Sequence, residues 1–581
     1  MRQPAQKIAA RYARRHARGT SASQEEAPSV EAVISVEAGP ILDATLSVEA
    51  QSMMEEAPMT EVAPIVEAPC MEAALSEDPP TADEAAFVAE EAQVLQSTQL
   101  TEAPAMFLAP ARLLLAPPRL QAPPSTDAPG IQISQVISAL SFALDLTEGQ
   151  LMGHAARTCM LGMRLAKALG MTETEQHDLY YALLLKDAGC SSNASKMFHI
   201  LGTDEISAKG ATKTLDWRNV GWGQIRYVLE RARPGRPMSE RLRTIFDIAL
   251  HRKRQTEQLI QIRCERGAQI AWRIGLSSDT SNAIYSLDEH WDGGGYPDGL
   301  RGAQIPAMAR ILNLAQTLEV FYSAHGPKAA MRIARQRSRT WFDPEMVRAA
   351  RSLAKKGELW RGLDAEDVLA HVVAMEPKEG ATPSSVEANE ATLDNICEAF
   401  AEVIDAKSHY TYSHSVGVAQ AAVGIARTMG MDANTVTMIR RASLLHDLGK
   451  LSVPNSILEK SGKLTQPEWE RVRKHPYYTH EILRRITGFE ELTEIAASHH
   501  EKLNGAGYYR NLTGAQLSRP ARVLMVADIF DALVADRPYR AAMPLEQVFR
   551  ILRNETPHAL DVACFEALVY WVERNAQKQA G

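Results

Sequence analysis

The sequence predicts an all-α protein, with two tandem helical domains that repeat each other and a disordered N-terminal tail. From residue 131 onward, apolar residues recur at helical spacing, with few β-branched runs and few hairpin signals. Within that part, residues of one segment recur in a second segment at a constant offset. The first 130 residues are rich in Ala, Glu and Pro and poor in aromatics. Such a composition cannot bury enough apolar surface to offset the entropy lost on ordering.

The composition excludes several classes of protein. At 581 residues, with 45% hydrophobic and 23% charged residues, the chain has the size and composition of a globular protein of two or three domains. No uninterrupted apolar run approaches the roughly 20 residues of a membrane span. The six cysteines are scattered and form no C-x-x-C pair. This argues against a disulfide framework and a thiolate metal site, and it predicts a cytoplasmic location.

The predicted tail, residues 1–130, separates its charges. Residues 1–23 hold six Lys or Arg and no acid, whereas residues 24–111 hold eighteen Asp or Glu and no base. The net charge of −8 therefore belongs to the tail. The leading KIAARYARRHARG is compatible with a transit peptide, a nucleic-acid contact or a membrane-surface arm. A solvated basic tip on a flexible tail is the favoured interpretation, and the sequence identifies no partner for it.

A linker at 372–391, rich in Pro, Gly and Ser, separates predicted domains at 131–371 and 392–581. The domains share residues at an offset of 260 without a gap: His154, Gly170, Met171, Asp187 and Gly189 match His414, Gly430, Met431, Asp447 and Gly449. A later block, which includes Gly295 and Gly507, matches at an offset of 212, so the first copy carries 48 extra residues. The two domains are therefore an internal duplication.

The second copy places histidines on buried helix faces. Ile439, Ala442 and His446 fall at i, i+3 and i+7, so His446 is expected to face inward. His414 begins a similar pattern in an upstream helix. Asp447 lies about 100° further round than His446. Because a buried unpaired aspartate is costly, it needs a cation or several hydrogen-bond donors.

Four more residues of ligand type follow in this copy: His475, His499, His500 and Asp528. Histidine and carboxylate suit Mn, Fe or Zn, and five histidines with two aspartates exceed the needs of one metal. They suffice for two divalent ions bridged by a carboxylate, which can clamp the attacking and leaving oxygens of a phosphoryl displacement. Each residue alone has a simpler explanation, such as a helix cap or a surface position, but all of those explanations would have to hold together.

The segment between Lys450 and His475 is predicted to form a new helix. Thr465 is its expected N-cap, with Glu468 as capping-box partner and Pro467 in the first turn. This helix is expected to carry His475 at its end. Upstream, Gly449 is expected to let the helix that carries His446 end.

The motifs LLHDLGKLSVPNSILEKSGKLTQPEWERVRKHP, HHE, GY and VADIFDALVADRPYR follow one another over about 405–550. In this order and spacing they resemble the HD superfamily of metal-dependent phosphohydrolases, most of all its HD-GYP branch of bacterial signalling phosphodiesterases that act on cyclic di-GMP. The resemblance implies two divalent metal ions, with Fe or Mn favoured, and these ligands: His414, His446, Asp447, His475, His499, His500 and Asp528. It implies catalytic roles for Asp447, as bridging carboxylate, and for Lys450, which would neutralise a phosphate oxygen. It also implies nucleotide binding by Gly507, Tyr508, Arg537 and Arg540.

Three positions of the second copy depart from the family pattern. The signature Gly-Tyr-Pro ends here in Tyr509, and Asn504 stands where an aspartate is usual. A glutamate that holds a third metal in some members is replaced by Tyr410. We therefore expect two metals rather than three. The departures concern the choice of substrate more than the hydrolase class.

The first copy has lost most of the ligand set. Lys186 stands for His446 and Cys190 for Lys450, and three further ligand positions hold Leu287, Asp288 and Gln316. Arg263 stands at the position that the offset of 212 matches to His475. A lysine ammonium cannot bind metal, but it can neutralise a buried Asp187. The hypothesis is that Lys186 replaces the metal as counter-ion and that this copy is catalytically dead.

The first copy nevertheless keeps an intact Gly-Tyr-Pro within DEHWDGGGYPDGLRGAQIP at 288–306. Two interpretations stay open: a loop kept for packing, or retained binding of a nucleotide or a partner. The inserted TLDWRNVGWGQIRYVLERARPGRP is aromatic and basic. It is compatible with binding a phosphate-bearing ligand or another domain.

The whole sequence thus predicts a cytoplasmic metal-dependent phosphodiesterase whose substrate is a small nucleotide, cyclic di-GMP above others. One alternative is an HD-type hydrolase of nucleotides or phosphomonoesters. A second is a non-catalytic nucleotide-binding regulator. The oligomeric state is open, a homodimer included.

Overall fold

The regular structure of the described residues is entirely helical. The computed structural model describes residues 131–201, 204–213, 237–377, 389–408, 413–460, 462–535 and 542–580. Within these ranges it contains α-helices and short 3₁₀ helices but no strand, which confirms the all-α prediction. The predicted tail, Tyr410, Arg537, Arg540 and nearly all of the inserted aromatic segment lie outside the described residues.

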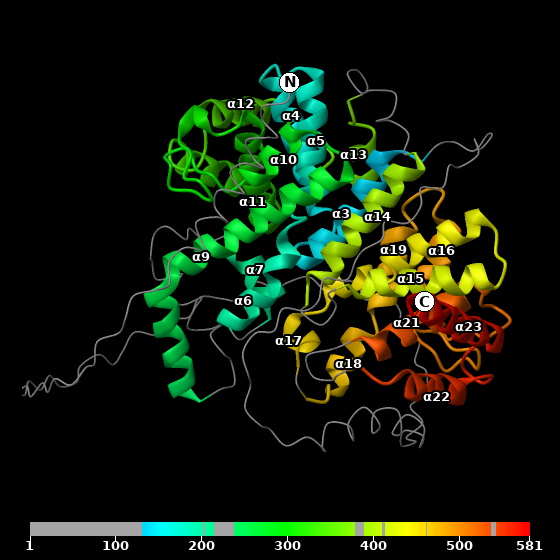
Figure 1. Cartoon of the computed structure of the whole chain (residues 1–581). Helices are drawn as coiled ribbons and strands as arrows, with labels where there is room; N and C mark the ends of the chain where they lie inside the picture. Colours follow the sequence, from blue (N-terminus) through cyan, green and yellow to red (C-terminus); the bar gives the residue numbers. More distant parts are fainter. Residues whose placement is uncertain are drawn as a thin grey trace, which may run out of the picture. The chain divides into compact units, whose positions relative to one another are not determined.

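The helices follow the chain in two series, and all of them belong to one unit of the chain, Leu120–Gly581. The first series is α3 (Ile133–Thr147), α4 (His154–Ala168), α5 (Glu173–Leu185), η1 (Cys190–Asn193), α6 (Ala194–Leu201), α7 (Glu205–Thr212), α9 (Met238–Ile274), α10 (Ser278–Tyr285), η2 (Gly302–Gln304), α11 (Ala307–Gln336), α12 (Pro344–Lys355) and α13 (Val368–Val373) (Figure 1). The second is α14 (Glu390–Asp405), α15 (His414–Thr428), α16 (Ala433–Leu445), η4 (Leu448–Ser452), α17 (Asn455–Leu458), α18 (Gln466–Val472), α19 (His475–Leu483), α20 (Glu490–Ala497), α21 (Arg519–Val534), α22 (Leu545–Glu555) and α23 (Val562–Ala580).

The duplication in the sequence is also a duplication of local structure. Helices α4 and α15 both begin at a histidine, His154 and His414. Helices α5 and α16 both begin after a capping side chain, Thr172 and Asp432, which accepts hydrogen bonds from backbone N–H groups of the first turn. These caps satisfy donors that a helix start otherwise leaves unpaired.

An aspartate fixes each of the two histidine-bearing helix starts. Asp145, at the end of α3, accepts hydrogen bonds from the backbone of Gly153 and Ala155. Asp405, at the end of α14, accepts one from the Ser415 hydroxyl at 2.8 Å. A carboxylate at a helix N-terminus is favoured by the helix dipole as well as by these bonds. The first residue of each helix is therefore held in place.

The apolar core runs through both copies. In the second copy α15 packs against α16 and α21; in the first, α4 packs against α5 and α11. Ile439 and Ala442 are fully buried together with His446, so the inward face predicted for that helix is confirmed. Burying each leucine or isoleucine side chain contributes about 1.5–3 kcal/mol, and this packing sets the helices that deliver the polar residues described below.

The two copies are in contact. Helix α3 contacts η4 and α19 of the second copy, and α14 contacts α9 and η1 of the first. Figure 1 shows α3 and α14 where the two series meet. The long helix α9 extends the first copy beyond its counterpart α19, and the inserted residues account for the difference.

The predicted helix after Lys450 forms, with one correction. Helix α18 has Thr465 as N-cap in a capping box with Glu468, as the sequence predicts. It ends at Val472, however, and His475 is the first residue of α19 rather than the end of α18. Pro476 explains the break, since a proline lacks the N–H that a continuing helix needs but is tolerated in a first turn.

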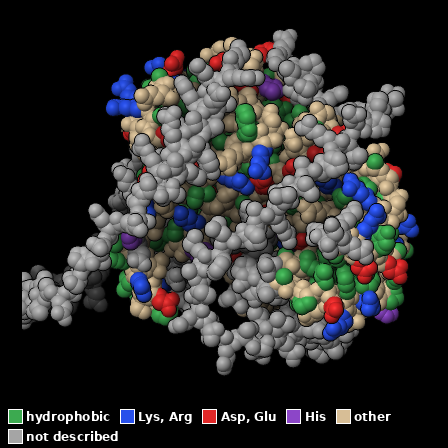
Figure 2. Space-filling model, viewed as in Figure 1, with side chains coloured by type: hydrophobic (Ala, Val, Ile, Leu, Met, Phe, Trp, Pro, Cys, Tyr) green, Lys and Arg blue, Asp and Glu red, His purple; other side chains and the backbone are tan. Residues whose placement is uncertain are grey.

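The surface shows no membrane-spanning element among the described residues. No helix in these ranges is both long enough and apolar enough to cross a bilayer. Figure 2 shows basic and acidic side chains interspersed over the face in view.

Candidate metal centre

Seven polar side chains of the second copy lie together where five segments meet. His414 opens α15, and His446 and Asp447 follow α16. The remaining four come from α19, the end of α20 and α21: His475, His499, His500 and Asp528. All except the half-buried His500 are buried. The structure thus brings together every residue that the resemblance implies as a ligand.

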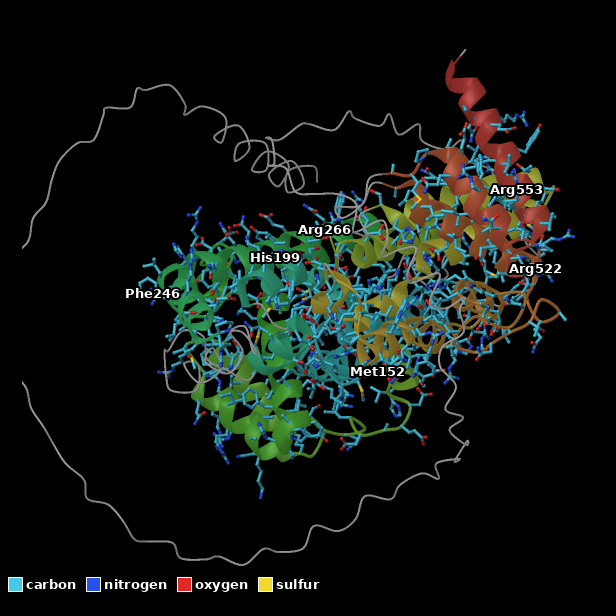
Figure 3. The ribbon with its side chains drawn as sticks, turned by 90° about the horizontal axis from the view of Figure 1, so that it is seen from below. Met152, His199, Phe246, Arg266, Arg522 and Arg553 are labelled. Atoms are coloured by element: carbon cyan, nitrogen blue, oxygen red, sulfur yellow. The ribbon has the colours of Figure 1, made fainter. Side chains whose placement is uncertain are left out.

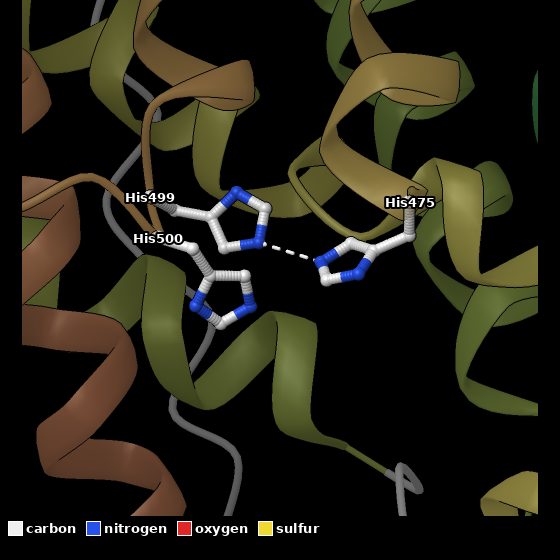
Figure 4. Close-up of side chains that lie close together, drawn as sticks. All are labelled: His475, His499 and His500. Carbon is white, nitrogen blue, oxygen red and sulfur yellow. Dashed lines mark hydrogen bonds between the residues drawn. The ribbon is translucent and has the colours of Figure 1, made fainter. Parts of the chain in front are cut away.

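The seven side chains form two groups. In the first, Asp528 Oδ1 lies 3.2 Å from His414 Nε2 and 3.7 Å from His446 Nε2. In the second, His475, His499 and His500 offer ring nitrogens that all lie within 4.8 Å of one another. Figure 4 shows these three rings facing one another. In each group the three ligand atoms lie within 4.8 Å of one another, close enough to hold an ion.

Asp447 stands between the groups and faces both. Its Oδ2 lies 3.2 Å from His446 Nε2 and 3.7 Å from His414 Nε2. Its Oδ1 lies 3.4 Å from His475 Nε2 and 3.6 Å from His499 Nε2. A carboxylate with one oxygen toward each set of histidines has the geometry of a bridging ligand.

Hydrogen bonds fix how the histidine rings are protonated. Three of the rings bind, through Nδ1 at 2.7 Å, the backbone carbonyl three residues earlier: His446 to Ser443, His475 to Val472 and His499 to Ala496. A carbonyl only accepts, so each Nδ1 donates a proton. In the neutral ring the Nε2 lone pair then points toward Asp447, which is the tautomer that binds metal.

The donor set fits divalent cations. His475 Nε2 and His499 Nε2 lie 3.0 Å apart (Figure 4), a hydrogen bond when one of the rings is protonated on Nε2. When both rings are neutral with the proton on Nδ1, the two facing lone pairs fit a shared cation. Within the described part of the chain, His446 Nε2 and Asp447 Oδ1 are buried and make no hydrogen bond. Buried polar atoms are almost always paired, so these atoms fit a bound ion. Nitrogen and oxygen donors of this kind suit Mn, Fe or Zn.

The electrostatics divide the histidines into two kinds. Burial alone lowers the pKa of His446, but the carboxylates of Asp447 and Asp528 outweigh it and raise the pKa to about 10. Burial lowers the pKa of His499 to about 4, with the charge of His446 acting in the same direction. The pKa values of Asp447 and Asp528 lie well below the ordinary value because the nearby cations and donors outweigh burial. Both carboxylates are therefore anionic at neutral pH.

The residues expected on the substrate side are described in part. Lys450 Nζ donates to Asp447 Oδ2 at 2.7 Å and is partly exposed. The Tyr508 ring stacks on His500, with 4.7 Å between centroids, and the Arg473 guanidinium lies 4.9 Å from the Tyr508 ring centroid. Gly507 lies so close to Glu501 that a Cβ there would approach the Glu501 Cα to 2.3 Å. Arg537 and Arg540 lie outside the described residues.

Two positions have structural roles that the sequence patterns did not predict. Asp531, one turn after Asp528, accepts a hydrogen bond from His414 Nδ1 at 2.8 Å and so orients that ring. Gly417 makes room for it, because a Cβ at Gly417 would lie 1.9 Å from Asp531 Oδ1. The spacing of three residues between the aspartates in VADIFDAL was the available signal.

The loop after the paired histidines is held by a glutamate and an asparagine. Glu501 accepts backbone hydrogen bonds from Arg510 and Leu512, as Glu289 of the first copy does from Asp298 and Leu300. Asn504 Oδ1 accepts from the backbone of Ala506 at 3.0 Å. Its counterpart Asp292 accepts from Gly294 at the same distance. An amide oxygen serves this turn as well as a carboxylate, so the Asn504 departure leaves the loop intact.

The equivalent place in the first copy is filled by ion pairs. Lys186 Nζ is buried and bonded to Asp187, and Arg263 is paired with Asp288. A Cβ at Gly189 would lie 1.9 Å from the Arg263 carbonyl oxygen, and one at Gly449 would lie 1.9 Å from that of His475. Arg263 therefore occupies the position of His475, as the sequence offsets predict.

Two further lysines, Lys209 and Lys213, form ion pairs at the position in the first copy that corresponds to the candidate metal centre. Lys213 Nζ lies 2.9 Å from Glu148 and 3.7 Å from Asp187, and Lys209 Nζ lies 3.4 Å from Glu148. Burial raises the pKa of Cys190, which keeps that neighbouring thiol protonated. Glu148, Asp187 and Cys190 lie close enough to share an ion, but the lysines already neutralise the carboxylates.

An all-α fold that gathers five histidines and two aspartates defines the class of histidine- and carboxylate-based metallohydrolases. A family model described as HD domain matches residues 245–346 and 398–563 of this chain. The 3′3′-cGAMP-specific phosphodiesterase 3 of Vibrio cholerae is 39% identical over 436 residues, which are 75% of this chain and 94% of that protein. A cyclic di-GMP phosphodiesterase of Pseudomonas aeruginosa is 36% identical over 28% of this chain and 39% of its own length.

A solved structure agrees with these matches. The crystal structure of cyclic GMP-AMP specific phosphodiesterases in V. cholerae superposes with a TM-score of 0.53 and 35% identity, and covers 77% of this chain and 98% of that one. The chain belongs to the HD superfamily of metal-dependent phosphohydrolases, and within it to the HD-GYP type.

Proposed function

We propose that the second copy hydrolyses a phosphodiester bond of a cyclic dinucleotide at a binuclear metal centre formed by the seven side chains. The observation that carries this proposal is the position of Asp447, with one carboxylate oxygen toward each of two histidine groups. His414, His446 and Asp528 would hold one ion and His475, His499 and His500 the other, and Asp447 would contribute to both.

The chain's own residues prepare the reaction. Two divalent ions held here would supply charge neutralisation and would make water a nucleophile at neutral pH. Asp447 and Asp528 hold the negative charge that retains the ions, and the backbone carbonyls keep the histidine Nε2 atoms directed inward. Lys450, partly exposed beside Asp447, is placed to neutralise a phosphate oxygen. Tyr508 and Arg473 offer a stacked aromatic and cationic surface for a base or phosphate.

The preferred substrate is proposed from the extent of the similarities. The sequence motifs alone favour cyclic di-GMP, and the Pseudomonas aeruginosa relative that matches 28% of the chain is named for that substrate. The relative that matches across both copies carries specificity for 3′3′-cGAMP in its name. We therefore rank 3′3′-cGAMP first and cyclic di-GMP second.

A substrate panel tests this function. Purified full-length protein loaded with Mn or Fe is incubated with 3′3′-cGAMP, cyclic di-GMP, mononucleotides and a phosphomonoester, and the products are separated by chromatography. Linear products from a cyclic dinucleotide are expected. Turnover of mononucleotides or the phosphomonoester alone would support the HD-type nucleotide hydrolase instead. Binding of cyclic dinucleotide without turnover in any metal would support the non-catalytic regulator.

Metal uptake is expected to release protons. His446 must lose its proton to bind a metal, and in the metal-free protein its pKa is raised to about 10. At pH 8 it is therefore protonated before metal binding, so affinity should rise about tenfold for each pH unit up to about 10. Calorimetric titrations of Mn into metal-free protein, in two buffers of different ionisation enthalpy, measure the released protons. When the metal is saturating, activity should fall only below about pH 6, where protons displace the ions from the ligand histidines. Binding without proton release would contradict the assignment of His446.

We also propose that the first copy is catalytically inactive and that Lys186 is the counter-ion of Asp187 in place of a metal. Replacing Lys186 by methionine leaves a buried carboxylate short of one cation, which should lower the free energy of unfolding by about 3–5 kcal/mol. Denaturant unfolding measures this change, and Lys186→Met combined with Asp187→Leu should recover most of it. The metal content should stay at two ions per chain in both variants. An unchanged free energy of unfolding in Lys186→Met would contradict the proposal.

A further inference from the structure

Helix α7 of the first copy contacts residues of the second copy that lie near its candidate metal ligands in the sequence. Glu205, the first residue of α7, is fully buried, and its carboxylate lies 3.1 Å from the ammonium of Lys407. The same carboxylate accepts hydrogen bonds from the backbone N–H of Asn455 at 2.9 and 3.1 Å. Lys407 and Asn455 both belong to the second copy and are themselves buried.

These contacts hold the two chain segments that flank the candidate metal centre. Lys407 Nζ donates to the carbonyl of Leu451 at 3.1 Å, and the Lys407 carbonyl accepts from the Asn455 side chain at 2.7 Å. Leu451 lies in η4, directly after Lys450 and close to Asp447. Lys407 lies between the end of α14 and His414. The Glu205 carboxylate of the first copy therefore connects two segments of the second copy. One is the segment before His414, which contains Lys407, and the other is the η4 segment, which carries Lys450 and begins directly after Asp447.

The other end of α7 is anchored in the place where the first copy lacks its metal site. Glu205, Lys209 and Lys213 follow one another at intervals of four residues, so they share one face of the helix. Lys209 donates to the Cys190 carbonyl at 2.6 Å, and Lys213 pairs with Glu148 and Asp187. The ion pairs that fill the first copy thus fix the helix that presents Glu205.

We propose that Glu205 is a positioning residue for the metal centre of the second copy, acting through Lys407 and Asn455 on the η4 loop. This inference rests on the proposed function of that centre. The first copy then contributes a required side chain to the site of the second. The contacts of Lys209 and Lys213 in the first copy hold α7 in the position that allows Glu205 to make its contacts.

The test compares the variant Glu205→Ala with the control variant Glu402→Ala. Glu402 on α14 also forms ion pairs between the copies, with Arg266 at 2.9 Å and with Arg273, both on α9. These pairs are partly exposed and involve neither α7 nor η4. Figure 3 labels Arg266 on α9. Full-length protein loaded with Mn is mixed with excess chelator, and the half-time of metal loss is measured together with kcat and KM for 3′3′-cGAMP.

Glu205→Ala should lose metal faster and lower kcat, each by up to about 10-fold, with little change in KM. This is the low end of the losses seen for direct partners of metal ligands, because Glu205 acts only through Lys407 and Asn455. Glu205→Gln keeps an acceptor for Asn455 and should give an intermediate result. Glu402→Ala should match the wild type. The double variant Glu205→Ala with Lys407→Met removes the unpaired ammonium, so its melting temperature should recover while metal retention and kcat stay low.

Wild-type metal retention and kcat in Glu205→Ala would overturn the inference, and so would full recovery of both in the double variant. Either result would mean that Glu205 contributes only to folding. If the wild-type protein hydrolyses no cyclic dinucleotide, the proposed function fails, but metal retention still decides the role of Glu205. If Glu205→Ala does not fold, Glu205→Gln and the double variant provide the same comparison.

Discussion

Replacing Asp447 by asparagine is expected to abolish hydrolysis, with kcat lowered by at least ~10³-fold. Asp447 faces both histidine groups, with Oδ2 3.2 Å from His446 Nε2 and Oδ1 3.4 Å from His475 Nε2. An amide offers a single neutral oxygen, so it cannot serve both groups or balance two cations. Metal content, measured by elemental analysis of the purified variant, should fall below two ions per chain.

Asp531→Asn is the matched control for this prediction. Asp531 is also a carboxylate beside the centre, but its contact is with Nδ1 of His414, on the far side of that ring. Its replacement should therefore cost only about 10–100-fold in activity or metal affinity. Equal losses in the two variants would show that Asp447 does not bridge. Full activity in Asp447→Asn would remove the basis of the proposed mechanism.

Replacing Gly449 by alanine is expected to destabilise the second copy by about 3 kcal/mol or more and to displace His475. A Cβ at position 449 would lie 1.9 Å from the His475 carbonyl oxygen, and backbone cannot move aside as a flexible side chain can. Overpacking of this kind costs about 1–3 kcal/mol and sometimes more. Denaturant unfolding gives the loss of stability, and metal analysis shows whether the histidine group that contains His475 still binds.

Gly514→Ala is the control, because a Cβ there meets its nearest atoms at an ordinary 3.5 Å. That variant should unfold within about 1 kcal/mol of the wild type, as expected for a substitution that meets no steric conflict. Normal stability and normal metal content in Gly449→Ala would contradict the close approach of η4 to α19.

Sequence patterns could predict helices because helical spacing and capping are local signals. The resemblance to the HD superfamily supplied the seven candidate ligands, and the structure brings these side chains together. Helical spacing placed His446 on the same face as Ile439 and Ala442, and the structure buries all three. The capping box at Thr465 and Glu468 forms as expected. The offset between the copies also located Arg263, whose backbone takes the position of His475 against the matching glycine.

Features that depend on distances between separate segments could not be predicted in this way. Gly449 was expected to end a helix, but α16 already ends at Leu445. Gly449 is instead needed because α19 passes at contact distance. Asp531 and Glu205 act on residues more than a hundred positions away. For Asp531 the three-residue spacing from Asp528 was the only local signal, and for Glu205 the sequence shows an ordinary first-turn position of a helix.

The lysine that neutralises Asp187 has a consequence for how the protein responds to its surroundings. In the proposed arrangement, a lysine of the first copy is the counter-ion of the buried aspartate, whereas the second copy takes up metal ions for this purpose. This proposal predicts that scarcity of transition metal stops hydrolysis, while the ion pairs that hold helix α7 in the first copy do not depend on metal. Resupply would then restore the enzyme by ion capture alone, without new synthesis of the chain.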